Sequence, residues 1–516
     1  MDQPQTFPDL ADGPAVRPTA RTAGPAGGRG RAAPLAVPAA AALALGLWGI
    51  DRQGSMWRDE SVTYQVAHRS LGELWALLGH IDAVHGLYYL LMHAVFAIWD
   101  GGLVALRLPS VAATAVAAAG VGAIGARLCG RRAGVLSGLV FAVLPLVQQY
   151  AQEGRSYALV CAAVTWATYF LLRATRESRG RWWTAYALAF GLACWLHEFA
   201  ALALVAHGLT LWRLRVSRGV WRRWGTASAG AVVSVAPLAV VSAGQSEQQL
   251  GWLGHPSLSA WLQFLAVSAA GVLLCRLRPR GPAGEDSPEG ATPASGSRAL
   301  AAIALPLLIT PAGLLMTLSL IKPWYVERYV LYGMTGLALA AGAALDRAIR
   351  HRHRLAPAAR TPTACLLAAA AVAVLLPWSL LVRSPQSRKD DVVAVAHAVE
   401  KYARPGDGVL FMPARRREWL LSYPSVYGKL DDLALAESPA ASHTLQGTEL
   451  PADTIRRRIL AADRIIALTD PPDQPLDPFE QERAKRQTLK AHFQVCERTR
   501  VRGAQIVVYA RPGHCT

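Results

Sequence analysis

The sequence predicts a polytopic α-helical membrane protein with a small α/β domain at its C-terminal end. Of its 516 residues, 53% are hydrophobic and 16 are tryptophans, and the mean hydropathy is positive. This is more apolar surface than the core of one soluble domain uses. The apolar residues form long runs separated in many places by arginine clusters, which is typical of a chain that crosses a membrane repeatedly.

Eleven apolar runs are long enough, or nearly long enough, to cross a bilayer. We expect them within a transmembrane part at 33–383, and they lie at 33–50, 104–126, 132–150, 156–173, 182–196, 197–212, 222–242, 258–276, 299–320, 329–346 and 362–382. The apolar run at 87–99 is too short to span. We expect it to be juxtamembrane or re-entrant, inside a first extracytoplasmic loop at 51–103.

Basic residues set the expected orientation, because cytoplasmic loops of membrane proteins are enriched in arginine and lysine. Residues 1–32 are rich in Pro, Gly, Ala and Arg, so we expect a disordered cytoplasmic tail followed by a retained membrane anchor. With this tail inside, the arginine-rich loops at 127–132, 173–181, 213–223, 276–280 and 347–354 also fall inside. A flexible cytoplasmic linker is expected at 285–298, and the domain at 384–516 is expected to be extracytoplasmic.

The formal net charge of +18 is explained by these loops. A nucleic-acid-binding protein would also be basic, but here the arginines stand in short clusters between apolar runs, so we expect no nucleic-acid partner. Anionic membrane lipids are the expected partners of such clusters.

A charged segment, Trp57-Arg58-Asp59-Glu60, follows the first apolar run. A carboxylate at the water-facing edge of a membrane bundle keeps its charge at little cost, and a pair of them is a candidate for acid–base chemistry. Alternatively, Asp59 caps the helix that we expect to begin at Ser61. These residues alone leave both roles open.

Two further short turns on the expected outer side carry charge. In the turn at 152–157, Arg155 is suited to bind a phosphate while Glu153 orients it or binds an acceptor hydroxyl; alternatively, Glu153 favours the N-terminal end of the next helix and Arg155 reaches lipid headgroups. In the turn at 322–329, Lys322 and Arg328 either meet lipid phosphates or neutralise a phosphate leaving group. The other outer charges favour the second use.

A third group of polar residues raises the alternative of a divalent cation. Asp82 and His85 are spaced to share a helical face, and His197 adds a further metal-ligand type where two apolar runs meet. Two ligands alone do not define a metal site, so interfacial hydrogen bonding stays the other reading. The predicted topology places all of these polar segments outside, which predicts an extracytoplasmic active site.

These residues together resemble the GT-C glycosyltransferases, in particular bacterial members similar to protein O-mannosyltransferases (glycosyltransferase family 39) and to the lipid A aminoarabinose transferase. The resemblance covers roughly residues 33–350. In chain order it is carried by Asp59-Glu60, the Asp82 and His85 segment with its tyrosines, Arg107-Leu108-Pro109-Ser110, the turn at 152–157, His197 and Glu327-Arg328-Tyr329.

The resemblance implies a membrane enzyme that takes a sugar, such as a mannose-like hexose, from a polyprenyl-phosphate donor and transfers it with inversion to a protein, lipid or glycan acceptor. On the family pattern, Asp59 matches the catalytic base and Glu60 its partner. His85 matches a histidine that prolines commonly follow, whereas Gly86 and Leu87 follow here. The residues expected to bind the donor phosphate or the substrate are Arg58, Tyr88, Gln152, Glu153, Arg155, Tyr157, Lys322, Arg328 and Tyr329.

The chemistry of such a transfer agrees with the residue types. A single displacement at the anomeric carbon needs a base at the acceptor hydroxyl and cations at the departing phosphate, which leaves as an anion without a general acid. A transporter or flippase for a lipid-linked glycan would also line a path with outer charges, and a glycan polymerase or ligase is a further alternative. No internal repeat is evident, which disfavours an inverted-repeat transporter.

The C-terminal segment predicts helices at 391–402 and 455–460 and strands at 408–411, 464–468, 494–497 and 505–509. Its role, as a structural lid or in acceptor recognition, stays open. Two of the seven cysteines, Cys496 and Cys515, fall in this segment. The compartment outside the cytoplasm is oxidising for thiols, so we expect a disulfide between Cys496 and Cys515. The other five stand in or beside apolar runs and are expected to be packing residues.

Overall fold

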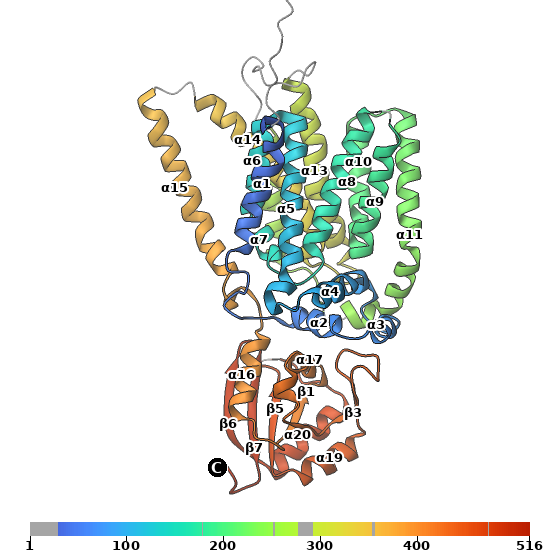
Figure 1. The fold of residues 1–516 in the computed structure, drawn as a ribbon, viewed down its shortest axis with the longest axis vertical. Coiled ribbons are helices and arrows are strands. Elements are labelled where there is room, and N and C mark those ends of the chain that lie inside the picture. The colour runs from blue at the N-terminus through green and yellow to red at the C-terminus, as the bar shows by residue number, and fades with distance from the viewer. Residues whose placement is uncertain are drawn as a thin grey trace, which may run out of the picture.

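The computed structural model describes residues 29–177, 179–250, 253–276, 293–352, 357–472 and 474–515. A helical bundle makes up the larger part, and a small α/β domain is attached at one end of it (Figure 1). Most of the predicted tail and the first half of the predicted linker lie outside the described residues.

Each of the eleven predicted runs corresponds to a helical segment of the bundle. These segments are α1 (Arg29–Leu47), α5 (Gly102–Cys129), α6 (Arg131–Val143) with α7 (Pro145–Ala151), α8 (Tyr157–Arg176), α9 (Arg181–Leu196), η2 (Glu198–Ala201) with α10 (Leu202–Arg213), α11 (Arg218–Leu250), α12 (Leu258–Arg276), α13 (Pro293–Leu318), η3 (Glu327–Gly333) with α14 (Met334–Arg352), and α15 (Pro357–Val382).

The number of membrane spans is smaller by a stricter test. In the described part of the chain, six helices are long and apolar enough to cross a membrane, and a seventh is added if the bent pair α6–α7 counts as one span. That pair bends by 66° at Pro145, the first residue of α7, where proline cannot continue the hydrogen bonding of the preceding helix. The polytopic fold is confirmed, and the count of eleven spans stays a prediction.

Close contact between helices positions the centre of the bundle. Helix α5 packs against α1, α6 and α8, and small residues allow this approach. A Cβ atom on Gly122 of α5 would meet the backbone of α1, and one on Gly342 of α14 would meet the backbone of α6. These two glycines therefore allow the close spacing of the helices that carry the turns at the end of the bundle.

Three short helices lie between the bundle and the α/β domain: α2 (Arg58–Ala67), α3 (Leu71–Leu78) and α4 (Gly86–Ile98), with η1 (Ala83–His85) before α4 (Figure 1). Helix α4 is the run that we predicted to be too short to span, and it lies at the end of the bundle. Its buried side chains pack against both the bundle and the α/β domain. Tyr88, Met92 and Phe96 belong to one apolar cluster with Leu106 of α5 and with residues of the α/β domain.

The α/β domain contains a five-stranded sheet in the order β2-β1-β5-β7-β6. Strand β1 pairs in parallel with β2 and β5, and β7 pairs antiparallel with β5 and β6. The strands are β1 (Gly408–Met412), β2 (Asp431–Asp432), β5 (Arg464–Thr469), β6 (Gln494–Val501) and β7 (Ala504–Ala510), and a separate two-stranded sheet joins β3 (Leu435–Glu437) to β4 (Thr448–Glu449).

Helices cover both faces of the five-stranded sheet. Alternate residues of a strand point to opposite faces, so Val409 and Phe411 pack toward α16 while Leu410 and Met412 pack toward α19 and α20. The helices of this domain are α16 (Val392–Tyr402), α17 (Glu418–Leu421), α18 (Pro424–Tyr427), α19 (Ala452–Ala461) and α20 (Glu480–His492), with η4 (Pro385–Ser387) and η5 (Ala414–Arg417). The predicted small α/β domain is therefore present, and all four predicted strands and both predicted helices lie in it.

The predicted disulfide between Cys496 and Cys515 is present in the structure. It joins β6 to the segment after β7, 19 residues further along the chain. Among the other five cysteines, Cys129, Cys161, Cys194 and Cys275 are free thiols that are buried or half-buried, as packing residues should be, and the side chain of Cys365 lies outside the described part of the structure.

We expect alkylation to separate the two kinds of cysteine. In SDS without reductant, the free cysteines Cys129, Cys161, Cys194 and Cys275 should react with iodoacetamide while Cys496 and Cys515 stay unmodified, because a disulfide has no thiolate to react. Peptide mapping of protein purified from membranes checks this, and the same mapping after reduction is the control. Full alkylation of Cys496 and Cys515 before reduction would show that the disulfide does not form.

Candidate active site

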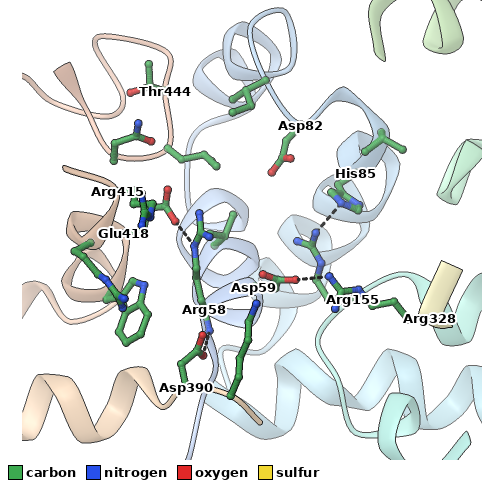
Figure 2. Close-up of a pocket in the computed structure, with 18 of the residues that line it drawn as sticks. Arg58, Asp59, Asp82, His85, Arg155, Arg328, Asp390, Arg415, Glu418 and Thr444 are labelled. Carbon is green, nitrogen blue, oxygen red and sulfur yellow. Dashed lines mark hydrogen bonds and ion pairs between the residues drawn. The ribbon is translucent and has the colours of Figure 1, made fainter. Parts of the chain in front are cut away.

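A cavity of about 1120 Å³ lies between the end of the bundle and the α/β domain (Figure 2). The bundle side of its wall comes from α2, the segment before α4, the turn before α8, and the starts of η2 and η3. The predicted site residues that line it are Arg58, Asp59, Asp82, His85, Arg155, Tyr157, His197, Arg328 and Tyr329. Segments far apart in the sequence therefore meet in one cavity, as the predicted topology requires.

Asp59 projects into this cavity from the first turn of α2. Its Oδ2 lies 3.3 Å from Nη2 of Arg328, and 23% of its side chain is exposed. The predicted alternative of a helix cap is wrong for Asp59: α2 begins at Arg58, and the backbone N–H of Trp57 donates to Glu60 Oε2 at 3.4 Å instead. The carboxylate of Asp59 is thus directed toward the cations of the cavity.

The charge state of Asp59 follows from its neighbours. Burial acts to raise the pKa of Asp59, but the guanidinium groups of Arg328, Arg155 and Arg58 together hold this pKa below its ordinary value. A carboxyl group with a lowered pKa is ionised throughout the neutral range. Asp59 is therefore present as a carboxylate, the form that can accept a proton.

Arg155 is held on the opposite side of Asp59 from the α/β domain (Figure 2). Its Nη2 lies 2.6 Å from His85 Nε2, and its Nη1 contacts Thr63 Oγ1 at 3.3 Å and Tyr89 Oη at 3.4 Å. Burial, together with the charge of Arg155, keeps the pKa of His85 well below its ordinary value. His85 is therefore neutral and accepts the hydrogen bond from Arg155 through Nε2.

Arg328 is surrounded by aromatic rings at the start of η3. Its Nε donates to Tyr157 Oη at 3.2 Å, and its guanidinium carbon lies 5.4 Å from the ring centres of Trp57 and Tyr157 and 5.6 Å from that of Tyr329. Cation–π contacts of this kind orient a guanidinium while leaving its edge free for an anion. Arg155 and Arg328 thus place two guanidinium groups beside one carboxylate.

Glu60 does not lie in the cavity, so its predicted role as the partner in catalysis is corrected. Its side chain is fully buried and forms hydrogen bonds of 2.7 Å with both Nε and Nη2 of Arg107. It also pairs with Arg52 at 3.3 Å and accepts the backbone N–H of Gly154 at 3.0 Å. Consecutive residues of a helix point about 100° apart, which is why Asp59 faces the cavity and Glu60 the interior.

Four predicted substrate-binding residues also lie outside the cavity. Gln152 donates to the carbonyl groups of Gly46, in the last turn of α1, and of Trp48, directly after α1, so it attaches the turn to the first helix. Glu153 is buried and pairs with Arg388 at 3.4 Å. The remaining two are Tyr88, which is buried in the cluster under the α/β domain, and Lys322, which is exposed with its Nζ 5.9 Å from the Trp324 ring.

The predicted alternative of a divalent cation at Asp82, His85 and His197 is not supported. In the described part of the chain, no group of three or more His, Cys, Asp or Glu side chains could hold a metal ion. The physical reason is visible at His85, where the Arg155 guanidinium lies against Nε2 and brings a positive charge to the atom that would bind the metal. Asp82 instead accepts a hydrogen bond of 2.6 Å from Tyr89.

Sequence reasoning missed the contribution of the α/β domain to the cavity wall. The residues of this domain and of the segment before it that line the cavity are Lys389, Asp390, Arg415, Arg416, Glu418, Trp419, His443, Thr444, Leu445, Gln446, Pro471, Gln474 and Gly503. One signal was available, because the run Arg415-Arg416-Arg417-Glu418 is unusually charged for a position directly after a buried strand. Nothing in the sequence showed that Arg415, Arg416 and Glu418 line the same cavity as Asp59.

Comparison with known proteins identifies relatives of this chain by sequence and by fold. Residues 86–243 match the family model described as dolichyl-phosphate-mannose-protein mannosyltransferase, and this segment contains His85's neighbours in α4, the turn with Arg155, and His197. No curated protein matches the chain significantly.

Among solved structures, the chain is similar to ArnT from Cupriavidus metallidurans in the apo state, with a TM-score of 0.57 and 14% identity over 91% of this chain and 96% of that one. The structure of the same ArnT bound to undecaprenyl phosphate gives a TM-score of 0.51 and 15% identity, with the same coverage. The chain therefore has the fold of ArnT. Together with the match to the mannosyltransferase family model, this confirms the predicted resemblance to the GT-C glycosyltransferases.

The buried Glu153 predicts a dependence of stability on pH. Burial raises the pKa of Glu153 to about 7 although Arg388 opposes this. The folded state then retains a proton that the unfolded state releases near the ordinary pKa of about 4.5. The free energy of unfolding therefore falls by about 3 kcal/mol as the pH rises from about 4.5 to about 7.

We expect Glu153→Gln to remove this loss, because glutamine does not ionise. The difference in thermal midpoint between Glu153→Gln and the unaltered protein should shift in favour of the variant between pH 5 and pH 8. Thermal unfolding in detergent measures it. Comparing the two proteins at each pH cancels the titration of other groups, and an equal difference at both pH values would contradict the assignment.

Proposed function

We propose that this protein transfers a hexose, such as mannose, from a polyprenyl-phosphate donor to a hydroxyl group of an acceptor, with inversion at the anomeric carbon. The observation that carries the proposal is the ion pair between ionised Asp59 and Arg328 on the wall of a cavity at the end of a membrane bundle. A donor anchored in the bilayer needs an active site at this level. The family match to a mannosyltransferase model supports the choice of sugar.

The residues divide the displacement between base and cation. Asp59 removes the proton from the acceptor hydroxyl while the hydroxyl oxygen forms a bond to the anomeric carbon. The bond from that carbon to the phosphate oxygen breaks, and the polyprenyl phosphate leaves with the electron pair. Arg155 and Arg328 stabilise the negative charge that develops on this phosphate, so the leaving group needs no added proton.

The two ArnT structures support the donor class. One of them holds undecaprenyl phosphate, a lipid of the kind that would leave in this reaction. Transfer of this property to the present chain is part of the proposal, because the two proteins share only 15% identity.

We further propose that the cavity and the domain at 384–516 are extracytoplasmic and that the N-terminal tail is cytoplasmic. Neighbouring helices of the bundle alternate in direction (Figure 1), so the loops between α5 and α6, between α8 and α9, and between α10 and α11 lie at the end away from the cavity. These are arginine-rich loops, which favour the cytoplasmic side.

Asp59→Asn tests the base. The substitution preserves shape but removes proton affinity, so we expect transfer to fall on the order of 100-fold or more while folding is retained. Mass spectrometry of lipid-linked sugars and envelope glycans in a deletion strain complemented with each variant measures the product. Asp100→Asn is the matched control, because Asp100 belongs to the same loop but is half exposed and pairs with His68. Transfer at the unaltered level by Asp59→Asn would exclude Asp59 as the base.

Arg155→Lys and Arg328→Lys test the phosphate site. Lysine retains the charge but loses the planar fork of the guanidinium, so we expect the affinity for undecaprenyl phosphate to fall by about tenfold in each variant, equal to about 1.4 kcal/mol. Native mass spectrometry of the detergent-purified protein with added undecaprenyl phosphate measures binding. Arg181→Lys is the control, since Arg181 is exposed at the start of α9. Unchanged affinity in both site variants would show that Arg155 and Arg328 do not bind the donor phosphate.

A further inference from the structure

The α/β domain holds the helix that carries Asp59. Arg58, the residue directly before Asp59, pairs through Nε with Glu418 Oε2 of α17 at 3.0 Å. The backbone N–H of the same Arg58 donates to Asp390 Oδ1 at 2.9 Å. Both contacts are drawn in Figure 2, where Arg58 lies between Asp59 and Glu418. The first turn of α2 is therefore attached to the α/β domain at two points.

Further contacts continue along α2 and the residues before it. Ser61 Oγ donates to the carbonyl of Glu418 at 3.1 Å and lies 2.7 Å from Ser422 Oγ. The backbone N–H of Val392 donates to the carbonyl of Met56 at 2.7 Å. Met56, two residues before α2, and Ala67, the last residue of α2, belong to the apolar cluster that contains strands of the α/β domain. The helix and the domain thus share one buried interface.

Glu418 is the central residue of this interface. Only 2% of its side chain is exposed, whereas 32% of the Arg58 side chain is exposed. A carboxylate that is removed from water is costly unless a cation compensates it, and Arg58 is the cation that does so here. The ion pair also affects Arg58. It holds the Arg58 guanidinium at Glu418 and therefore away from the neighbouring carboxylate of Asp59.

We propose that Glu418 is a positioning residue for Asp59, acting through Arg58. It fixes the first turn of α2 and keeps the Arg58 guanidinium from occupying the oxygen atoms of Asp59. The α/β domain is then part of the catalytic apparatus, because the orientation of the base depends on it. This inference rests on the proposed function only for its kinetic consequence; the attachment of α2 can be measured separately.

The kinetic test uses Glu418→Gln, which retains the shape of the side chain and removes its charge. The freed guanidinium of Arg58 then competes for Asp59, so kcat should fall by about tenfold while the affinity for undecaprenyl phosphate stays within about twofold. The double variant Arg58→Gln/Glu418→Gln should be no slower than Glu418→Gln alone, because the competing guanidinium is gone. Glu400→Gln is the control, since Glu400 is an exposed residue of the same domain paired with Lys429.

The structural test uses hydrogen–deuterium exchange of the full-length protein in detergent. Amide exchange in the peptide that contains residues 58–67 should be faster in Glu418→Gln and in Arg58→Gln than in the unaltered protein, and unchanged in Glu400→Gln. If Glu418→Gln does not fold, Arg58→Gln supplies the same comparison from the other side of the pair.

The outcomes separate this inference from the proposed function. Unchanged exchange in α2 would overturn the attachment, and a double variant whose loss is the product of the two single losses would overturn the action through Arg58. If the unaltered protein transferred no sugar, the proposed function would fail, and the exchange measurement would still decide whether the α/β domain holds α2.

Discussion

Glu60 accepts hydrogen bonds from Arg107, Arg52 and the backbone of Gly154 inside the protein, and the rest of the site depends on this interaction. It joins α2, α5, the segment after α1 and the turn that precedes α8. An ionised carboxylate without partners would be very costly at this depth, so these elements are held in one arrangement. Breaking such a buried network by removing one partner commonly costs about 3 to 5 kcal/mol.

The two neighbouring carboxylates of α2 therefore have different tasks. The charge of Glu60 is compensated by its ion pairs with Arg52 and Arg107. Asp59 points the other way, remains partly exposed, and pairs with Arg328 on the wall of the cavity. The same pattern applies to the turn before α8, where Gln152 and Glu153 are used to hold the turn and Arg155 is presented to the cavity. Within each short charged motif, some residues build the site and others act in it.

The α/β domain is bound to this arrangement from the other side. Its apolar core continues into α4 through Tyr88, Met92 and Phe96, and Arg388 before α16 pairs with Glu153. A cluster shared in this way is typical of one folding unit more than of two domains joined by a linker. Charged residues on the edge of the domain consequently become part of the cavity wall.

The sequence by itself determined the class of fold, the positions of the apolar segments, the α/β character of the C-terminal part and its disulfide. Apolar runs, alternating apolar and polar residues, and basic loops are local patterns. They predict membrane spans, strands and orientation without knowledge of distant contacts. It also indicated Asp59, Arg155 and Arg328, because the pattern of basic loops places these charges on the opposite side of the membrane from the arginine clusters. Only the tertiary structure decided which charged residues face the cavity, as the contrast between Asp59 and Glu60 shows. It alone brought Glu418, 360 residues away along the chain, next to Arg58. The direction of a side chain depends on the helix that carries it and on partners far away in the sequence, and residue type and spacing do not contain that information.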